Sequence, residues 1–83
     1  MLNVFLFIEL LGSANADASL KALKALELTQ CTISHAVKLN EEKLVAQIDC
    51  PDLESANAAL LQKIAGVDGV VQSNIIAVVK PRN

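Results

Sequence analysis

Aromatic residues and clustered basic charge are both scarce in this 83-residue sequence. It has no Trp and no Tyr, and two phenylalanines make aromatics only 2% of a chain that is 53% hydrophobic, so the core must be aliphatic. Seven Lys and Arg are scattered among nine acidic residues, for a net charge of −2. This distribution argues against direct nucleic-acid binding, which needs a concentrated basic surface. A chain this short forms a single domain, residues 1–83.

The sequence also lacks a membrane span and a framework of cysteines. The apolar stretch at residues 2–11 is too short to cross a bilayer as a helix, and Asn3 and Glu9 interrupt it with no basic segment before it, unlike a signal peptide. We therefore expect a cytoplasmic protein without membrane contacts. Two cysteines in a domain with its own core do not make a disulfide framework, and cytosolic thiols stay reduced.

Apolar periodicity predicts four strands and two helices. Alternation with period two marks the strands, and spacing of three to four residues marks the helices, before a short tail at 81–83. The strands are expected at 2–11, 30–39, 43–50 and 70–79, and the helices at about 15–27 and 52–65. The order β-α-β-β-α-β with right-handed crossovers predicts a ferredoxin-like α+β sandwich, whose antiparallel sheet has strand order 4-1-3-2 and both helices on one face.

Caps and apolar stripes define the two helices. Asn15 or Asp17 can cap the first, and Asp52 can cap the second by accepting a hydrogen bond from the first turn. Gly66 marks a stop. The residues expected to face the sheet are Ala16, Leu20, Leu23 and Leu26 in the first helix, and Leu53, Ala56, Leu60 and Ile64 in the second.

The sheet face away from the helices is expected to carry an apolar patch. By alternation, its apolar members are Phe5, Phe7, Val45, Val70, Ile76 and Val78. A patch of this size usually marks an interface, although strand twist is an alternative that breaks it up. We expect a homodimer or larger symmetric oligomer formed through this face.

The two cysteines are predicted to be unreactive core thiols. If the second and third strands turn at residues 41–42, Leu39 opposes Leu44 and Ile33 opposes Cys50. Cys31 then lies diagonal to Cys50 on the core face, about 7–8 Å away. That separation is too long for a disulfide.

No catalytic, metal or cofactor site is predicted. In the same register His35 faces the core opposite Ile48, and with two cysteines it falls short of the four ligands of a structural zinc site. Ser34 and His35 are adjacent strand residues that point to opposite faces, so they cannot form a catalytic dyad. The residues therefore predict a protein that is not an enzyme.

Residues 61–79, Leu-Gln-Lys-Ile-Ala-Gly-Val-Asp-Gly-Val-Val-Gln-Ser-Asn-Ile-Ile-Ala-Val-Val, resemble the effector-binding (RAM) domain of the Lrp/AsnC transcription regulators. In that family a Lys-Ile pair ends the second helix and a Gly-Val pair enters the last strand, as at residues 63–64 and 69–70 here. Ser73 stands where the family often has a threonine. Asn40 and Lys43 occupy hairpin positions where the family usually has glycine and aspartate, so the charge is reversed at Lys43. The resemblance covers the effector domain and does not extend to the family's DNA-binding helix-turn-helix, so we expect a stand-alone effector-type domain.

The resemblance implies a non-catalytic regulatory domain that dimerises across its sheets and holds an amino-acid-type effector between subunits. By the same resemblance, the ligand would lie near Asn40, Lys43 and Ser73. Two alternatives remain. Residues 42–48 are similar to the cytoplasmic chaperone of periplasmic nitrate reductase, which binds a twin-arginine signal peptide on its sheet. The second alternative is a small dimeric ferredoxin-like isomerase or monooxygenase, enzymes that place polar side chains in a cavity over the open face. In this chain the polar residues expected on that face are mainly Asn3, Glu9, Gln47 and Asp49.

Overall fold

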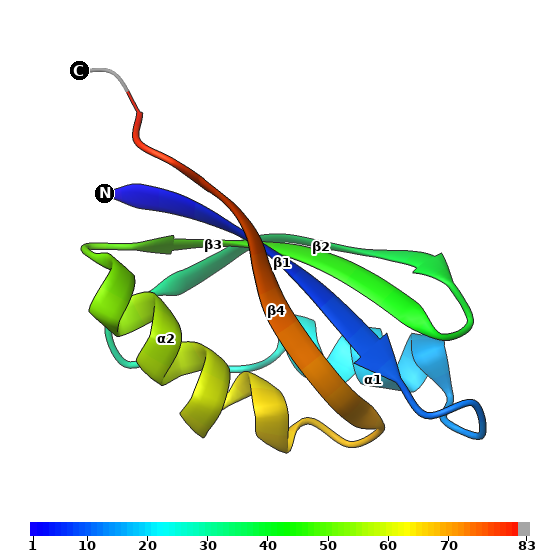
Figure 1. Cartoon of the computed structure of the whole chain (residues 1–83). Helices are drawn as coiled ribbons and strands as arrows, with labels where there is room; N and C mark the ends of the chain where they lie inside the picture. Colours follow the sequence, from blue (N-terminus) through cyan, green and yellow to red (C-terminus); the bar gives the residue numbers. More distant parts are fainter. Residues whose placement is uncertain (82–83) are drawn as a thin grey trace.

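The computed structural model describes residues 1–81 and has the predicted ferredoxin-like architecture, with one antiparallel sheet above two helices (Figure 1). Residues 82–83, the end of the predicted tail, lie outside the described part of the chain. The strand order β2-β3-β1-β4 is the expected 4-1-3-2 order read from the other edge. The elements are β1 (Leu2–Leu10), α1 (Ala16–Lys24), β2 (Thr32–Asn40), β3 (Lys43–Cys50), α2 (Leu53–Gln62), the 3-10 turn η1 (Ile64–Gly66) and β4 (Val70–Val79).

Both helices begin at the side-chain caps that the sequence predicts. The Asn15 Oδ1 accepts a hydrogen bond from the Ala18 N–H at 3.1 Å, and the Asp52 Oδ1 accepts one from the Ser55 N–H at 2.7 Å. Each bond satisfies a backbone donor that the first helical turn would otherwise leave free. α1 is shorter than expected, because it ends at Lys24 rather than near Glu27.

The Asp52 cap is expected to make part of the protein's stability depend on pH. The hydrogen bonds from Ser55 lower the pKa of Asp52 below its ordinary value of 3.8. A lowered pKa in the folded state means that this stabilisation is present above the ordinary value and is lost as the pH falls through the folded-state pKa. Asp52→Asn keeps a neutral cap. Its melting temperature is therefore expected to fall less steeply than that of the wild type below pH 4 in thermal melts followed by circular dichroism. Equal slopes of melting temperature against pH for the two proteins below pH 4 would contradict a contribution from the Asp52 carboxylate.

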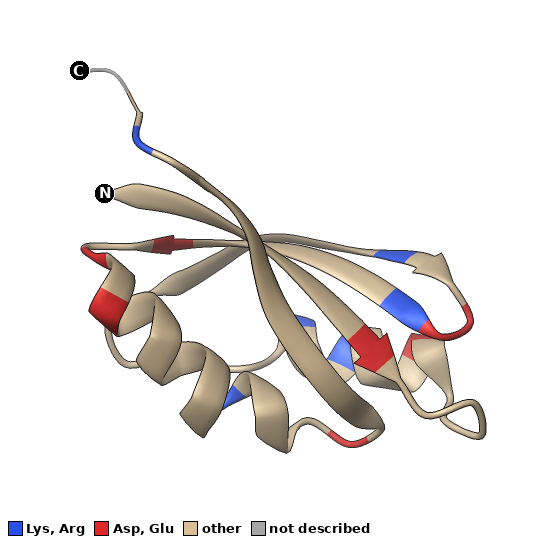
Figure 2. Cartoon of the chain, in the orientation of Figure 1, with Lys and Arg blue, Asp and Glu red and all other residues tan. Residues whose placement is uncertain are grey.

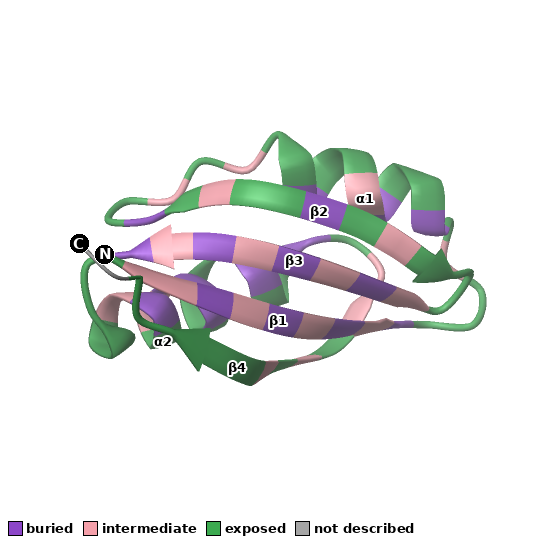
Figure 3. Cartoon of the chain, turned by 90° about the horizontal axis from the view of Figure 1, so that it is seen from above, coloured by how far each residue is buried: buried purple, intermediate pink, exposed green. Residues whose placement is uncertain are grey.

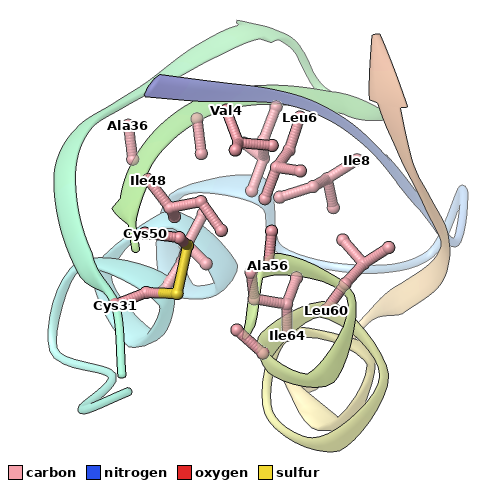
Figure 4. Close-up of a cluster of buried hydrophobic side chains, with 14 of the residues drawn as sticks. Val4, Leu6, Ile8, Cys31, Ala36, Ile48, Cys50, Ala56, Leu60 and Ile64 are labelled. Atoms are coloured by element: carbon pink, nitrogen blue, oxygen red, sulfur yellow. A yellow bond between two sulfur atoms is a disulfide. The ribbon is translucent and has the colours of Figure 1, made fainter. Parts of the chain in front are cut away.

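The core lies between the sheet and the helices and is aliphatic. The inward side chains of β1 and β3 are buried, and α2 and η1 cover them with Ala56, Leu60 and Ile64 (Figures 3 and 4). Leu53, expected to be in this core, is 47% exposed. It lies on the first turn of α2, and the buried stripe of that helix begins one turn later at Ala56. Among residues 1–81, no helix is long and apolar enough to cross a membrane.

β2 departs from regular alternation, and this changes which of its residues face the core. Ile33 pairs with Ile48, but His35 pairs with Gln47, so β2 has one additional residue at this point. Such an irregularity reverses the faces of the residues that follow it. His35 is therefore exposed rather than in the core opposite Ile48, and Ala36 is buried instead. A second irregularity lies between Lys38 and Asn40: Lys38 pairs with Leu44, and Asn40 pairs with Lys43.

The new register makes the two cysteines direct neighbours across β2 and β3. Because Thr32 pairs with Asp49, Cys31 lies opposite Cys50, and their Cα atoms are 4.4 Å apart. They form a disulfide, which lies among the buried side chains below the sheet (Figure 4). The prediction of two free thiols is therefore wrong. It assumed an uninterrupted hairpin register, in which the two residues were diagonal.

β4 contains two irregularities of the same kind. Phe5 pairs with Ala77 whereas Leu6 pairs with Ile75, and a second shift lies between Glu9 and Leu10. As a result Val70 lies opposite Leu10 and Val78 opposite Val4, on the side of the helices. The assignment of Val70 and Val78 to the open face is therefore wrong. Ile76 lies at the first irregularity and is 57% exposed.

Lys38 ties β2 to the first turn of α1. Its Nζ lies 3.0 Å from the Asp17 carboxylate and 3.1 Å from that of Glu41. The hydrogen bond to Asp17, followed by that to Glu41, raises the pKa of Lys38. Its partner on α1 places the Lys38 head on the helix side, away from the open face of the sheet.

Candidate functional site

Within residues 1–81, neither helix covers the sheet face opposite α1 and α2 (Figure 3). The pairing of the strands arranges the residues of this face in rows across the sheet. Phe7 of β1 pairs with Val45 of β3, which pairs with Val37 of β2. Phe5 lies in the next row, opposite Gln47 and Ala77. Phe5, Phe7 and Val45 are half-buried and Val37 is 53% exposed. The centre of this open face is therefore an apolar patch containing both aromatic residues of the chain.

The irregularity in β2 adds Val37 to this patch. A strict alternation places Val37 on the core side with Cys31 and His35, so sequence reasoning missed it. Leu39, which the alternation also places in the core, is 56% exposed. The alternation of apolar residues gives no sign of an irregularity in an edge strand. The faces of Val37 and Leu39 could therefore not be predicted from the sequence.

The open face has a basic group at one end of β3. The Lys43 Nζ lies 5.9 Å from the centroid of the Phe7 ring, within the range of a cation–π interaction, and Lys43 pairs across the strands with Glu9. The Lys43 side chain therefore extends toward the apolar patch, where its ammonium group can interact with an acidic group of a partner surface.

The other end of β3 carries a carboxylate held by neighbouring side chains. The Ser34 hydroxyl donates to the Asp49 Oδ2, and the Gln47 amide donates to its Oδ1 at 3.1 Å. His35 lies beside this group as the strand partner of Gln47. The Asp49 carboxylate on the open face therefore accepts hydrogen bonds from two neighbouring side chains, which fix its position.

This polar group does not have the geometry of a catalytic triad. In a triad the histidine bonds both the nucleophile and the carboxylate, whereas here Ser34 donates directly to Asp49. The cysteines are joined to each other and are not available as thiolate nucleophiles or ligands. Residues 1–81 contain no group of three or more His, Cys, Asp or Glu placed to hold a metal ion.

The three residues expected to contact an effector are only partly brought together. Asn40 and Lys43 pair with each other at the β2–β3 hairpin, where the Asn40 Oδ1 accepts from the Glu42 N–H at 2.9 Å. Ser73 lies on β4 opposite Ile8, whose side chain is in the core, so it is on the helix side of the sheet. Lys43 pairs with Glu9 on the open side. Within one chain, Ser73 therefore faces away from the other two.

Comparison with known proteins adds no relative. No family model matches the chain, and neither curated proteins nor solved structures give a significant match. Function is therefore argued from the residues and geometry of this chain.

Proposed function

We propose that this chain is a non-catalytic association domain that forms a homodimer, or a larger symmetric oligomer, through the open face of its sheet. The observation that carries this proposal is the apolar patch of Phe5, Phe7, Val45 and Val37 on a sheet face with no covering layer. Aromatic side chains contribute strongly to interfaces because each can bury about 150–250 Å². A two-fold axis covers the patch with a second copy of itself.

The charges on this face are compatible with such a pairing. Lys43 and Asp49 lie at opposite ends of β3. A two-fold axis in the plane of the interface and perpendicular to the strands lays the Lys43 end of one sheet over the Asp49 end of the other. Lys43 of each copy then approaches Asp49 of the other on both sides of the apolar centre, while Glu9 lies beside each Lys43 within its own sheet.

The resemblance to Lrp/AsnC effector domains extends the proposal to regulation by an amino-acid-type ligand. Since Ser73 and Lys43 face opposite sides of one sheet, a single ligand that touches both needs residues from two subunits. Ligand binding would then depend on the oligomer. Thermal-shift screening against amino acids tests this extension, because a ligand of the folded state raises the melting temperature by mass action.

Replacing Phe7 by aspartate tests the association directly. Phe7→Asp is expected to convert the oligomer to the monomer, because the new carboxylate would be buried without a partner. The measurement is the molar mass by light scattering at micromolar concentration. Leu61→Asp is the matched control, since Leu61 lies on α2 and is 74% exposed, away from the open face. The proposal fails if the wild type is a monomer of 8.8 kDa, or if a folded Phe7→Asp variant keeps the oligomer mass.

A second candidate uses the same face to bind a cationic extended peptide, as the nitrate reductase chaperone does. The supporting observation is the Asp49 carboxylate, held beside the apolar patch by Ser34 and Gln47. Calorimetric binding of a twin-arginine peptide that is lost in Asp49→Asn, in a protein that does not dimerise, would favour this candidate. Turnover of a substrate that is lost in the same variant would instead favour an enzyme.

The Cys31–Cys50 disulfide bears on where the chain functions. Disulfides form and persist in oxidising compartments, whereas the cytosol keeps most thiols reduced. The bond therefore favours an oxidising compartment over the cytoplasmic location that the sequence predicts. Association through the open face is expected in either location, because both cysteines lie below the sheet and not in the apolar patch.

A further inference from the structure

The β4 edge of the sheet has the composition of a pairing strand. Within residues 1–81, β4 pairs with β1 alone, and six of its ten residues are Val or Ile, with no charge, proline or glycine. Figure 2 shows the whole strand without charged residues. Proteins usually protect exposed edges with charged side chains or proline, because the free N–H and C=O groups of an edge bind other strands.

Apolar side chains are exposed on both faces of β4. Val78 is 44% exposed and lies on the helix side, opposite Val4. Val79 is 47% exposed and lies on the open side, opposite Asn3. A partner on the open face covers only the second of these. A strand beside β4 covers both and also pairs the outward backbone groups.

The opposite edge of the sheet, β2, is better protected. Lys38 lies on it and holds the α1 helix through Asp17, and α1 packs against β2. His35, Ser34 and Asn40 add further polar groups along this strand. β4 has two irregularities of its own, but they leave the segment from Gln72 to Ile75 regular in its middle.

The charged residues at the two ends of β4 indicate the direction and identity of a strand that could pair with it. Asp68 precedes the strand and Lys80 follows it, and both are exposed (Figure 2). Antiparallel pairing with an identical strand, centred on Asn74, brings the Lys80 of each copy opposite the Asp68 of the other. Parallel pairing would bring like charges together. The ends of β4 are therefore complementary to a second β4 running in the opposite direction.

We propose that two copies of this chain pair antiparallel through β4, forming a continuous sheet with four strands from each copy. This interface is separate from the open face and does not rest on the association proposed there. If both interfaces form and their two-fold axes intersect at right angles, the assembly closes as a dimer of dimers.

A charge exchange tests the antiparallel pairing. Lys80→Asp and Asp68→Lys each place two like-charged pairs at the ends of the β4 interface, and each is expected to weaken the dimer on the order of tenfold at low salt. The double variant Asp68→Lys/Lys80→Asp restores opposite charges and is expected to regain wild-type affinity. Sedimentation equilibrium gives the dissociation constants. Equal affinities for all four proteins would overturn the assigned pairing.

Val78→Lys tests the edge independently of the charges. Val78 lies on the helix side of an edge strand, so a lysine there obstructs strand pairing without touching the open face. The variant is expected to lose the edge dimer and keep its circular dichroism spectrum. In the wild type, β4 amides are expected to exchange more slowly as concentration rises. An unchanged oligomer in folded Val78→Lys, or a monomer whose β4 amides are protected only by an added peptide, contradicts the proposal.

The two association proposals can fail separately. If the protein dimerises only through the β4 edge, Phe7→Asp leaves the dimer intact and Val78→Lys dissociates it. If it dimerises only through the open face, the effects of the two substitutions are reversed. If both interfaces form a tetramer, each variant reduces the tetramer to a dimer, and the combined variant is a monomer.

Discussion

Loss of the Cys31–Cys50 disulfide is expected to lower the free energy of unfolding by about 3 kcal/mol, because the bond restricts the unfolded chain by closing a loop. The two cysteines are separated by 19 positions, and the bond joins the residue before β2 to the last residue of β3, at the end opposite the β2–β3 hairpin. For a domain of this size, that loss corresponds to a fall in melting temperature of roughly 10–25 °C.

The measurement is a thermal melt of the protein after reduction in denaturant and refolding with reductant. Denaturant is needed because Cys31 is 4% exposed and Cys50 is fully buried. Cys31→Ala/Cys50→Ala is the control, and reductant is expected to leave its melting temperature unchanged. A reduced wild type that melts at the temperature of the oxidised protein would show that the bond contributes nothing.

Gly69→Ala is expected to destabilise the fold by about 2–4 kcal/mol, through backbone strain and a lost hydrogen bond. Gly69 has φ = 90°, a conformation that residues with a side chain rarely adopt. A Cβ atom there would lie 2.8 Å from the Ser19 Oγ and 2.9 Å from the Ala14 Cβ. Ser19 is 4% exposed and its hydroxyl donates to the Asp68 carbonyl at 2.7 Å, so it cannot move away without breaking that bond.

Gly66→Ala provides the matched control for the same substitution. No atom lies within 4 Å of the Cβ position at Gly66, and among residues 1–81 Gly69 is the glycine with positive φ. Gly66→Ala is expected to change stability little, or to stabilise by up to about 1 kcal/mol through the unfolded state. Denaturant titration of both variants measures the difference. Equal midpoints would show that the Gly69 turn tolerates a side chain.

The alternation of apolar residues in β1 and β3 was enough to predict the architecture. Val4, Leu6 and Ile8 face the core as expected, and the Asn15 and Asp52 caps mark the helix starts. These signals are local, because a side chain's face follows from the strand period and a cap acts within one turn. Local signals were also sufficient for Phe5, Phe7 and Val45, which lie on a central pair of strands without irregularities.

Only the tertiary structure decided the faces of the two edge strands. Each has two irregularities, and each irregularity moves the residues beyond it to the opposite face or to another partner. This change placed Val37 in the open-face patch, turned Val70 and Val78 toward the helices, and brought Cys31 opposite Cys50. The sequence alone determined the order and type of the elements, since these follow from local periodicity. Register across strands depends on how the edge strands fit the twisted central pair, which no local pattern encodes.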